Sequence, residues 1–125
     1  MKFARNVFLF AGCYGLVVIV PMYFSEARLN IDFPPAITHP EYFYGFIGVT
    51  MAWQMAFLVI ARDVVRYRLL ILPSVVEKFS YAAAGLHLFI NGRAPSAIAV
   101  AAVFDLVLGV LFLASFVTTK QKSIS

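Results

Sequence analysis

The sequence predicts an all-α integral membrane protein, a four-helix bundle with antiparallel up-down topology and both termini in the cytoplasm. Of its 125 residues, 62% are hydrophobic and 13% are charged, about half the charged fraction of a typical soluble domain. Four apolar stretches each approach the roughly 20 residues that a helix needs to cross about 30 Å of hydrocarbon. Helices fit these stretches because a helix satisfies its own backbone polar groups inside lipid, whereas barrel strands would alternate apolar and polar residues.

The first predicted span, about 7–24, follows the basic residues Lys2 and Arg5. A secretory signal is the rival interpretation, because Ser25-Glu26-Ala27 has small residues at a cleavage-like spacing. The apolar run is long for a signal peptide, so we expect a retained span.

The second predicted span, about 42–61, follows a long loop. Thr38 is the expected N-cap, and Glu41 three residues later completes a capping box. Pro40 then lies among the first helical residues, where its missing amide costs nothing. Pro34-Pro35 makes the middle of the preceding loop extended and stiff.

The third and fourth predicted spans, about 69–90 and 97–117, are separated by a short turn. Gly92 is available in this turn as a helix C-cap, and Pro95 lies near the next helix start. These two spans are therefore expected to be antiparallel neighbours. Because the four spans leave little chain outside the membrane, residues 1–125 are expected to form a single transmembrane domain.

The basic residues predict the orientation. Only Arg28 and Arg93 lie on the side opposite the termini. On the side of the termini lie Lys2, Arg5, Arg62, Arg66, Arg68, Lys120 and Lys122. The positive-inside rule therefore predicts cytoplasmic termini, in an inner or plasma membrane. The bases lie in short clusters and form no stripe that could follow a phosphate backbone, so no nucleic-acid partner is expected.

Small residues at helical spacing predict where the helices approach one another, because lipid gives no hydrophobic drive between helices. The predicted contact rows are Ala97, Ala101, Asp105 and Gly109 on the fourth span, Gly45, Gly48, Ala52 and Ala56 on the second, and Ala11 and Gly15 on the first. Since Asp105 belongs to such a row, we expect its side chain to face protein and not lipid.

Polar residues at depth are informative, because an ionised side chain in hydrocarbon costs several kcal/mol unless it is paired, hydrated or neutralised. At about 1.5 Å per residue, one polar layer lies roughly 10–18 Å from the cytoplasmic side. Its members are Tyr14, Trp53, Gln54, Glu77, Lys78, Tyr81 and Asp105. The long stem of Lys78 can reach Asp105, which leaves Glu77 for Gln54, Tyr14, a water or a proton.

The polar layer has two main interpretations, beside a third in which Lys78 extends to the cytoplasmic surface and belongs to no layer. The structural one is a buried polar clasp that fixes the register of the helices. The functional one is a cavity with an acid, a base and aromatic walls. Its ligand-binding residues would be Tyr14, Trp53, Gln54, Glu77 and Tyr81. In an enzyme, Glu77 and Asp105 would act as proton donor and acceptor, tuned by Lys78; the chain shows no other catalytic set, so an enzyme is not favoured.

Two weaker candidates lie near the membrane surfaces. Arg62, Arg66 and Arg68 are candidates for holding anionic lipid head groups, and Asp63 is expected to form an ion pair with Arg66. The acids and histidines of the outer loop offer no ligand pair at helical spacing, so no metal site is expected. The sequence indicates no particular cofactor.

Several motifs carry a resemblance to known proteins. They are the run 39–46 (HPEYFYGF), Trp53-Gln54, Ala61-Arg62-Asp63, Arg66-Tyr67-Arg68 and Glu77-Lys78. From residue 39 on, the chain resembles small uncharacterised four-helix membrane proteins of bacteria. In general plan these are similar to DoxX-like and EXPERA-type proteins, which include sterol isomerases and lipophile-binding receptors. The resemblance implies the four-helix fold and assigns no catalytic residue.

Three functions remain open. The sequence favours a non-catalytic accessory or scaffolding subunit that packs against other membrane proteins or a second copy, because the extramembrane mass is small and the chain has 13 phenylalanines. The alternatives are a protein that binds or isomerises a lipophile such as a sterol, quinone or carotenoid, and a component of a proton or small-ion pathway. A closed bundle with Lys78 bonded to Asp105 and no cavity would favour the scaffold, and a pocket of several hundred cubic ångströms that touches Glu77 and opens to lipid would favour the binder.

Overall fold

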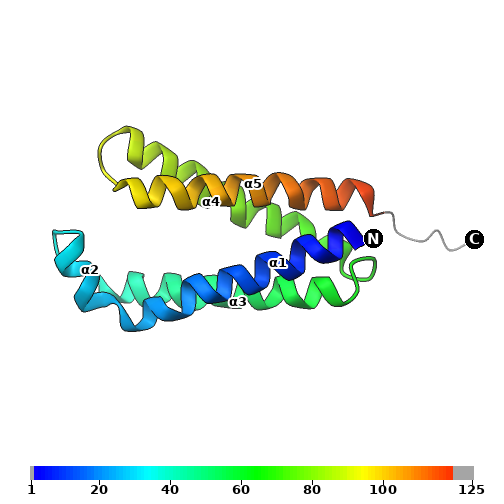
Figure 1. Ribbon diagram of the computed structural model, residues 1–125, viewed down its shortest axis with the longest axis horizontal. Coiled ribbons are helices and arrows are strands. Elements are labelled where there is room, and N and C mark those ends of the chain that lie inside the picture. The colour runs from blue at the N-terminus through cyan, green and yellow to red at the C-terminus, as the bar shows by residue number, and fades with distance from the viewer. Residues whose placement is uncertain (1, 120–125) are drawn as a thin grey trace, which may run out of the picture.

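The computed structural model describes residues 2–119 and confirms the all-α, four-helix plan (Figure 1). In chain order the elements are α1 (Lys2–Ile19), the 3-10 helix η1 (Val20–Phe24), α2 (Glu26–Asp32), α3 (Pro40–Arg62), the 3-10 helix η2 (Arg68–Leu70), α4 (Ile71–Ile90) and α5 (Ser96–Thr118). The basic residues Lys120 and Lys122, which helped to predict the orientation, lie outside the described residues.

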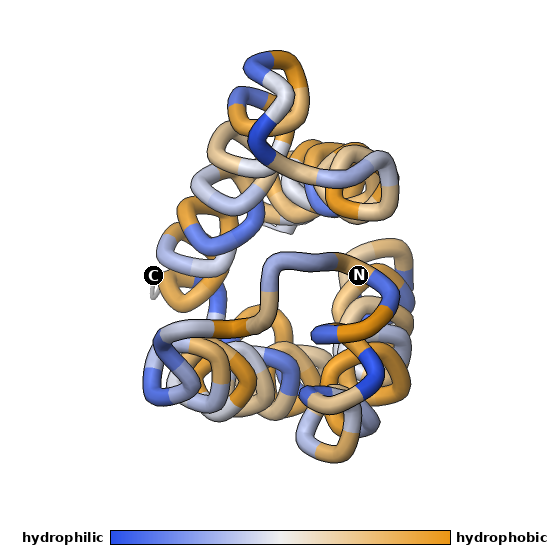
Figure 2. The backbone as a smooth tube through the Cα atoms, turned by 90° about the vertical axis from the view of Figure 1, so that its left-hand side faces the viewer, coloured by the Kyte–Doolittle hydropathy of each residue, from blue (hydrophilic) through white to orange (hydrophobic). Residues whose placement is uncertain are grey.

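Within residues 2–119, four segments are long and apolar enough to cross a membrane. Each has 23 residues, which as a helix is about 35 Å long. Large apolar side chains such as those of Val17, Met55 and Val110 are exposed along them, and Figure 2 shows that hydrophobic residues dominate the long helices. A helix that is apolar on its outer face suits hydrocarbon and not water. The length and composition are those of a multi-pass membrane protein.

The connection before α3 differs from the expected extended loop. Residues Glu26–Asp32 form α2, in which Arg28 Nε donates to Asp32 Oδ2 at 2.9 Å across one helical turn. The Tyr44 hydroxyl of α3 donates to Glu26 Oε2 at 2.7 Å. This second bond holds α2 against the start of α3, so only the segment from Phe33 to His39 remains without helical structure.

The expected capping box at the start of α3 is wrong. His39 occupies the N-cap position, and no side chain bonds to the first amides of the helix. Glu41 lies instead with its Oε1 3.2 Å from His39 Nδ1. Pro40 begins the helix, as predicted. The first amides of a helix have no partner inside the helix. Because proline has no amide hydrogen, Pro40 leaves one fewer unpaired donor at this helix start, even without a cap.

The predicted turn between α4 and α5 is confirmed. Gly92 has a φ of 72°, a left-handed conformation that favours glycine. The amide of Arg93 donates to the carbonyl of Leu88 at 2.8 Å, and that of Gly92 to Phe89 at 3.0 Å. This bond pattern is a Schellman motif, which ends α4 and turns the chain back into α5.

The helices pack as two antiparallel pairs, α1 with α3 and α4 with α5. The pairs meet at the end that holds the chain termini and separate toward the end that holds α2 and the α4–α5 turn (Figure 1). Between the pairs, α1 contacts α5 much more than α3 contacts α4. The bundle is therefore closed on the α1–α5 side and open between α3 and α4.

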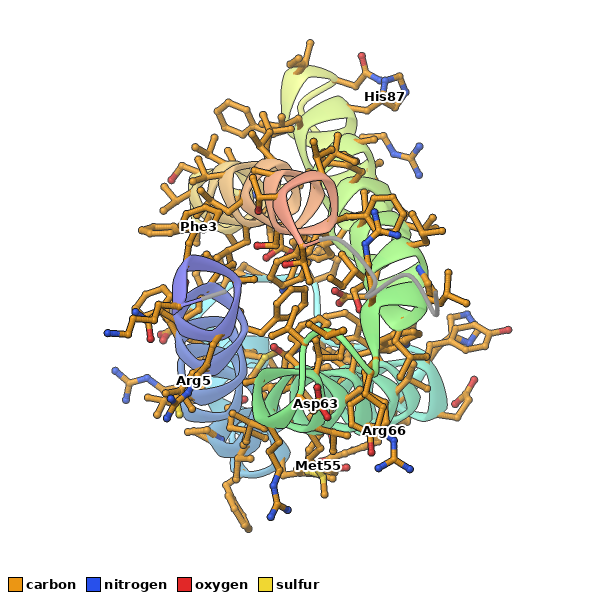
Figure 3. The ribbon with its side chains drawn as sticks, turned by 90° about the vertical axis from the view of Figure 1, so that its right-hand side faces the viewer. Phe3, Arg5, Met55, Asp63, Arg66 and His87 are labelled. Atoms are coloured by element: carbon orange, nitrogen blue, oxygen red, sulfur yellow. The ribbon has the colours of Figure 1, made fainter. Side chains whose placement is uncertain are left out.

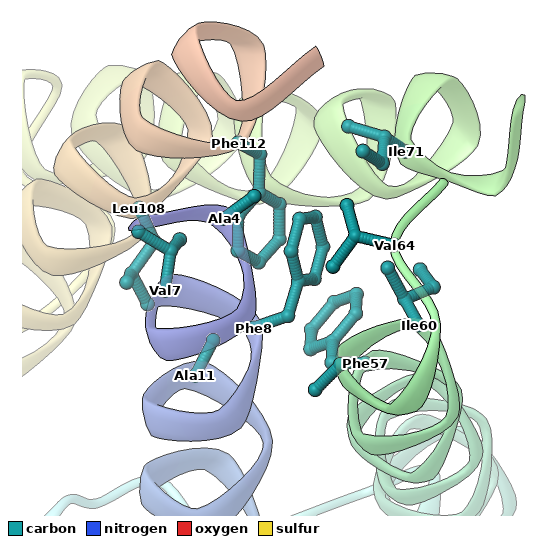
Figure 4. Close-up of a cluster of buried hydrophobic side chains, with 11 residues drawn as sticks. Ala4, Val7, Phe8, Ala11, Phe57, Ile60, Val64, Ile71, Leu108 and Phe112 are labelled. Carbon is teal, nitrogen blue, oxygen red and sulfur yellow. The ribbon is translucent and has the colours of Figure 1, made fainter. Parts of the chain in front are cut away.

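A cluster of buried apolar residues joins the two pairs near the termini (Figure 4). The ring of Phe8 from α1 stacks on Phe112 from α5, with centroids 4.2 Å apart. The ring of Phe57 from α3 meets Phe112 edge to face at 4.9 Å. Offset stacks and edge-to-face pairs are favourable arrangements of aromatic rings. Three of the four long helices thus share one aromatic contact.

The helix contacts use small residues, but not all of the predicted ones. Gly15 of α1 lies against Gln54, and Gly109 of α5 lies against the ring of Phe79, as the rows on those helices predicted. The row on α3 is wrong in part, because Gly45 and Ala52 are exposed, whereas Gly48 lies close to the Tyr23 hydroxyl. On α3 the face that meets α1 carries larger side chains, and the small residues are on α1.

Candidate functional site

The centre of the molecule holds a buried lysine between two carboxylates. Lys78 Nζ lies 3.4 Å from Asp105 Oδ1 and 3.6 Å from Glu77 Oε2. Its side chain is 5% exposed, and those of Glu77 and Asp105 are each 17% exposed. The ammonium also lies 5.2 Å from the centroid of the Phe57 ring, close enough for a cation–π contact. The predicted pairing of Lys78 with Asp105, and the inward direction of Asp105, are confirmed.

Two of the partners expected for Glu77 are wrong. Glu77 contacts Lys78, its neighbour in the chain, and not Gln54 or Tyr14. Successive side chains on a helix point about 100° apart, but the four-carbon stem of Lys78 is long enough to bring its ammonium back between both acids. Glu77 Oε2 is enclosed, and within residues 2–119 it accepts no hydrogen bond.

The five predicted ligand-binding residues do not share one site. Gln54 is 1% exposed and lies in the seam with α1, where its Nε2 donates to the carbonyl of Thr50 at 3.0 Å. Tyr14 lies beside Phe104 of α5, with ring centroids 5.8 Å apart. The other predicted ligand-binding residues, Trp53, Glu77 and Tyr81, line one cleft between α3 and α4.

This cleft has a volume of about 280 Å³. It is lined by Phe46, Val49, Thr50 and Trp53 from α3 and by Glu77, Ser80 and Tyr81 from α4. The rings of Phe46 and Tyr81 lie nearly parallel across it, with centroids 6.1 Å apart. Glu77 is the one charged residue among these lining residues. The cleft therefore combines flat aromatic walls with a single carboxylate.

Sequence reasoning missed four of the lining residues, Phe46, Val49, Thr50 and Ser80. The spacing of the three α3 residues and Trp53 along the chain could have indicated that they share one face of the helix. Val49 and Thr50 lie three and four residues after Phe46, and Trp53 lies three residues after Thr50, which puts all four on one face of α3. The spacing alone does not assign them to a site, because no feature of the sequence indicates that α3 and α4 stand apart.

A second cleft continues the first along α3. It has a volume of about 410 Å³ and is lined by Glu41, Tyr42, Gly45, Phe46, Val49 and Thr50. The two clefts share three residues, so they form one groove that follows α3 from Glu41 to Trp53. At about 1.5 Å per residue this groove is about 18 Å long. An elongated apolar molecule fits its shape.

The arrangement does not assemble the acid pair that an isomerase would use. Asp105 is not among the residues that line the groove, and its contact is with Lys78. A ligand in the groove can meet the Glu77 carboxylate, whereas Asp105 lies on the other side of the lysine. Among residues 2–119, no group of three or more potential ligands has the geometry of a metal site.

The three arginines predicted to hold lipid head groups have different surroundings. Arg68 Nη2 donates to the carbonyl of Phe116 at 2.9 Å, and Nε donates to the carbonyls of Phe116 and Thr119. Its guanidinium lies 3.7 Å from the centroid of the Phe116 ring. Arg68 is thus held against the end of α5, which corrects its interpretation as a lipid-binding residue. Arg62 and Arg66 are exposed, as a head-group contact requires.

The expected ion pair between Asp63 and Arg66 takes another form. Asp63 Oδ1 accepts the backbone amide of Arg66 at 3.1 Å. This is the local bond by which aspartate stabilises a turn. The guanidinium of Arg66 extends away from the helices (Figure 3) and lies 5.5 Å from the ring centroid of Tyr67.

The chain has no significant match among protein-family models, curated proteins or solved structures. The resemblance to DoxX-like and EXPERA-type proteins therefore stays a prediction.

Proposed function

We propose that this protein binds an elongated lipophile, such as a sterol, quinone or carotenoid, in the groove between α3 and α4. The observation that carries the proposal is the 280 Å³ cleft that touches Glu77 between two helices that barely contact each other. Lipid-facing clefts with apolar walls and few polar groups are suited to apolar ligands. The bonded pair of Lys78 and Asp105 holds α4 against α5 beside the cleft and leaves Glu77 to line it.

The walls of the groove favour a flat or chain-like ligand. The parallel rings of Phe46 and Tyr81, together with the indole of Trp53, offer flat surfaces to an unsaturated or ring-shaped body. The Glu77 carboxylate accepts hydrogen bonds, so a hydroxyl on the ligand is its natural partner. In this proposal Glu77 anchors and orients the ligand, and no bond of the ligand is broken.

We also propose which membrane holds the chain and how the chain is oriented in it. The chain lies in an inner or plasma membrane with both termini in the cytoplasm. Support comes from the described basic residues at the end of the bundle that holds the termini, which are Lys2, Arg5, Arg62, Arg66 and Arg68. At the opposite end Arg28 is paired with Asp32, which leaves Arg93.

Trp53 makes a direct binding experiment possible, because it is the one tryptophan of the chain and it lines the cleft. Retinol is a suitable probe, since it has a hydroxyl, an elongated polyene body and an absorption that overlaps tryptophan emission. We expect energy transfer from Trp53 to retinol that saturates at one molecule per chain in detergent-purified protein. Glu77→Gln should weaken the apparent affinity several-fold, because an amide accepts a hydrogen bond less strongly than a carboxylate.

Two matched variants separate binding from partition into the micelle. Ser80→Phe places a large ring in the cleft, whereas Ala83→Phe adds the same ring on an exposed face of the same helix. Energy transfer should be lost in the first and kept in the second. Equal transfer in both would overturn the proposal.

Mass spectrometry of material purified in mild detergent gives the second readout. A lipophile that co-purifies at one per chain supports the proposal. A polypeptide that co-purifies in stoichiometric amount, without a lipophile, contradicts it and supports the scaffolding role that the sequence favours.

A further inference from the structure

A third cleft lies at the other end of the molecule, between α1 and α3. It has a volume of about 290 Å³ and is lined by Arg5, Leu9, Leu58, Ala61 and Arg62. Arg5 lies in the first turn of α1, and Arg62 is the last residue of α3. Because the two helices are antiparallel, both arginines lie at the end of the bundle that holds the termini, where Figure 3 labels Arg5.

Neither of these two arginines has its charge paired within the described part of the chain. Neither Arg5 nor Arg62 forms an ion pair or a side-chain hydrogen bond among residues 2–119. The acid next to Arg62, Asp63, bonds to the amide of Arg66. By contrast, Arg28 is paired with Asp32, and Arg68 is held by the end of α5. Two guanidinium groups therefore border one cleft with no carboxylate between them.

The rest of the cleft is apolar. Leu9 lies one turn deeper on α1 than Arg5, and Leu58 lies one turn deeper on α3 than Arg62. The cleft thus has arginines at the level of a membrane surface and aliphatic side chains toward the hydrocarbon. Guanidinium groups suit phosphate because they offer several donors in a fixed plane. The aliphatic part of the cleft suits a hydrocarbon chain. A free phosphate ion has no apolar group to cover this part.

We infer that Arg5 and Arg62 bind the phosphate of an anionic phospholipid whose acyl chain lies over Leu9 and Leu58. The site differs from the sequence-based set Arg62, Arg66 and Arg68. The fold adds Arg5, which is 57 positions before Arg62 in the chain, and assigns Arg68 to the end of α5. The inference is independent of the lipophile groove, since it shares no residue with it.

The test measures how lipids change the melting temperature of the full chain in detergent. Dioleoylphosphatidylglycerol should raise the melting temperature, whereas dioleoylphosphatidylcholine and inorganic phosphate should not. A ligand that binds only the folded protein stabilises it by mass action. The increase should fall as salt is added, because the arginines are exposed and their charges are screened.

Variants assign the effect to the two arginines. The double variant Arg5→Gln/Arg62→Gln should fold normally, because both side chains are exposed, and should lower the apparent affinity for phosphatidylglycerol at least tenfold. Arg93→Gln, an exposed arginine in the α4–α5 turn, is the matched control and should leave the affinity unchanged. An unchanged response in the double variant overturns the inference. A full response to inorganic phosphate alone also overturns it, because it indicates a site for a soluble anion.

Discussion

The ammonium of Lys78 lies 3.4 Å from Asp105 Oδ1, and this contact joins α4 to α5 in the middle of the bundle. Both side chains are largely shielded, with 5% and 17% of their surface exposed. A buried ion pair is a weak source of net stability, but removing one partner leaves a charge that is costly to bury. Here a second carboxylate, Glu77, lies 3.6 Å from the same ammonium, so the lysine is not left alone when Asp105 is lost.

The arrangement predicts non-additive effects of removing the two acids. Asp105→Asn and Glu77→Gln should each destabilise the fold by less than the roughly 3–5 kcal/mol that an isolated buried charge costs. The double variant should reach that range, because Lys78 then has no carboxylate partner. Unfolding of the four proteins in detergent gives the coupling free energy. Strictly additive effects would show that the two carboxylates do not share the lysine.

Alanine should have opposite effects at two glycines, Gly109 in the contact between α4 and α5 and Gly45 on an open face of α3. A Cβ atom at Gly109 would lie 2.5 Å from the Phe79 ring, whereas one at Gly45 would meet no atom within 4 Å. Gly109→Ala should destabilise the bundle by about 1–3 kcal/mol through overpacking. Gly45→Ala should stabilise it by about 0.5–1 kcal/mol, since alanine favours a helix. Thermal melts in one detergent compare the two. Destabilisation by Gly45→Ala would contradict the exposed position of that residue.

The aromatic cluster near the termini predicts a large effect of one phenylalanine. Phe112 is fully buried against Phe8 and Phe57, so Phe112→Ala should cost about 3–5 kcal/mol by leaving a cavity. Phe24, which is 89% exposed, provides the control, and Phe24→Ala should change stability by less than about 0.5 kcal/mol. Equal losses in the two variants would show that the cluster does not join the helix pairs.

The sequence predicted features that depend on neighbouring residues in the chain, together with one long-range contact that a strict energetic requirement dictates. The long apolar runs predicted four helices, and Gly92 predicted the turn between α4 and α5. The pairing of Lys78 with Asp105 was also predicted, because a buried charge needs a partner and the depths of the two residues agree. Each of these inferences rests on a single element or on one strict requirement.

Features that depend on how far apart the helices stand could not be predicted. The groove beside Trp53 exists because α3 and α4 diverge, and residue spacing on each helix is the same whether the helices touch or not. The exposed Gly45 shows the same limit, because a small residue permits a close approach but does not require it. Arg68 was assigned to lipid because its partners, the last carbonyls of α5, are 48 or more positions away in the chain.

Arg68 predicts a local effect at the end of α5. The last carbonyls of a helix have no partner inside the helix, and in hydrocarbon or at its edge an unsatisfied carbonyl is costly. Arg68 supplies donors to the carbonyls of Phe116 and Thr119, and it also covers the Phe116 ring. Its position just before α4 means that the start of one helix holds the end of the next.

Arg68→Gln should therefore loosen the end of α5 and cost about 1–3 kcal/mol, the range for leaving a buried acceptor unsatisfied. Hydrogen exchange should speed up at the amides of residues 115–119, whose protection depends on the helix end, and stay unchanged in the Schellman turn at Gly92. Arg66→Gln is the matched control, because that exposed arginine makes no side-chain hydrogen bond within residues 2–119. Faster exchange at residues 115–119 in both variants would indicate a general effect of surface charge and contradict the specific role of Arg68.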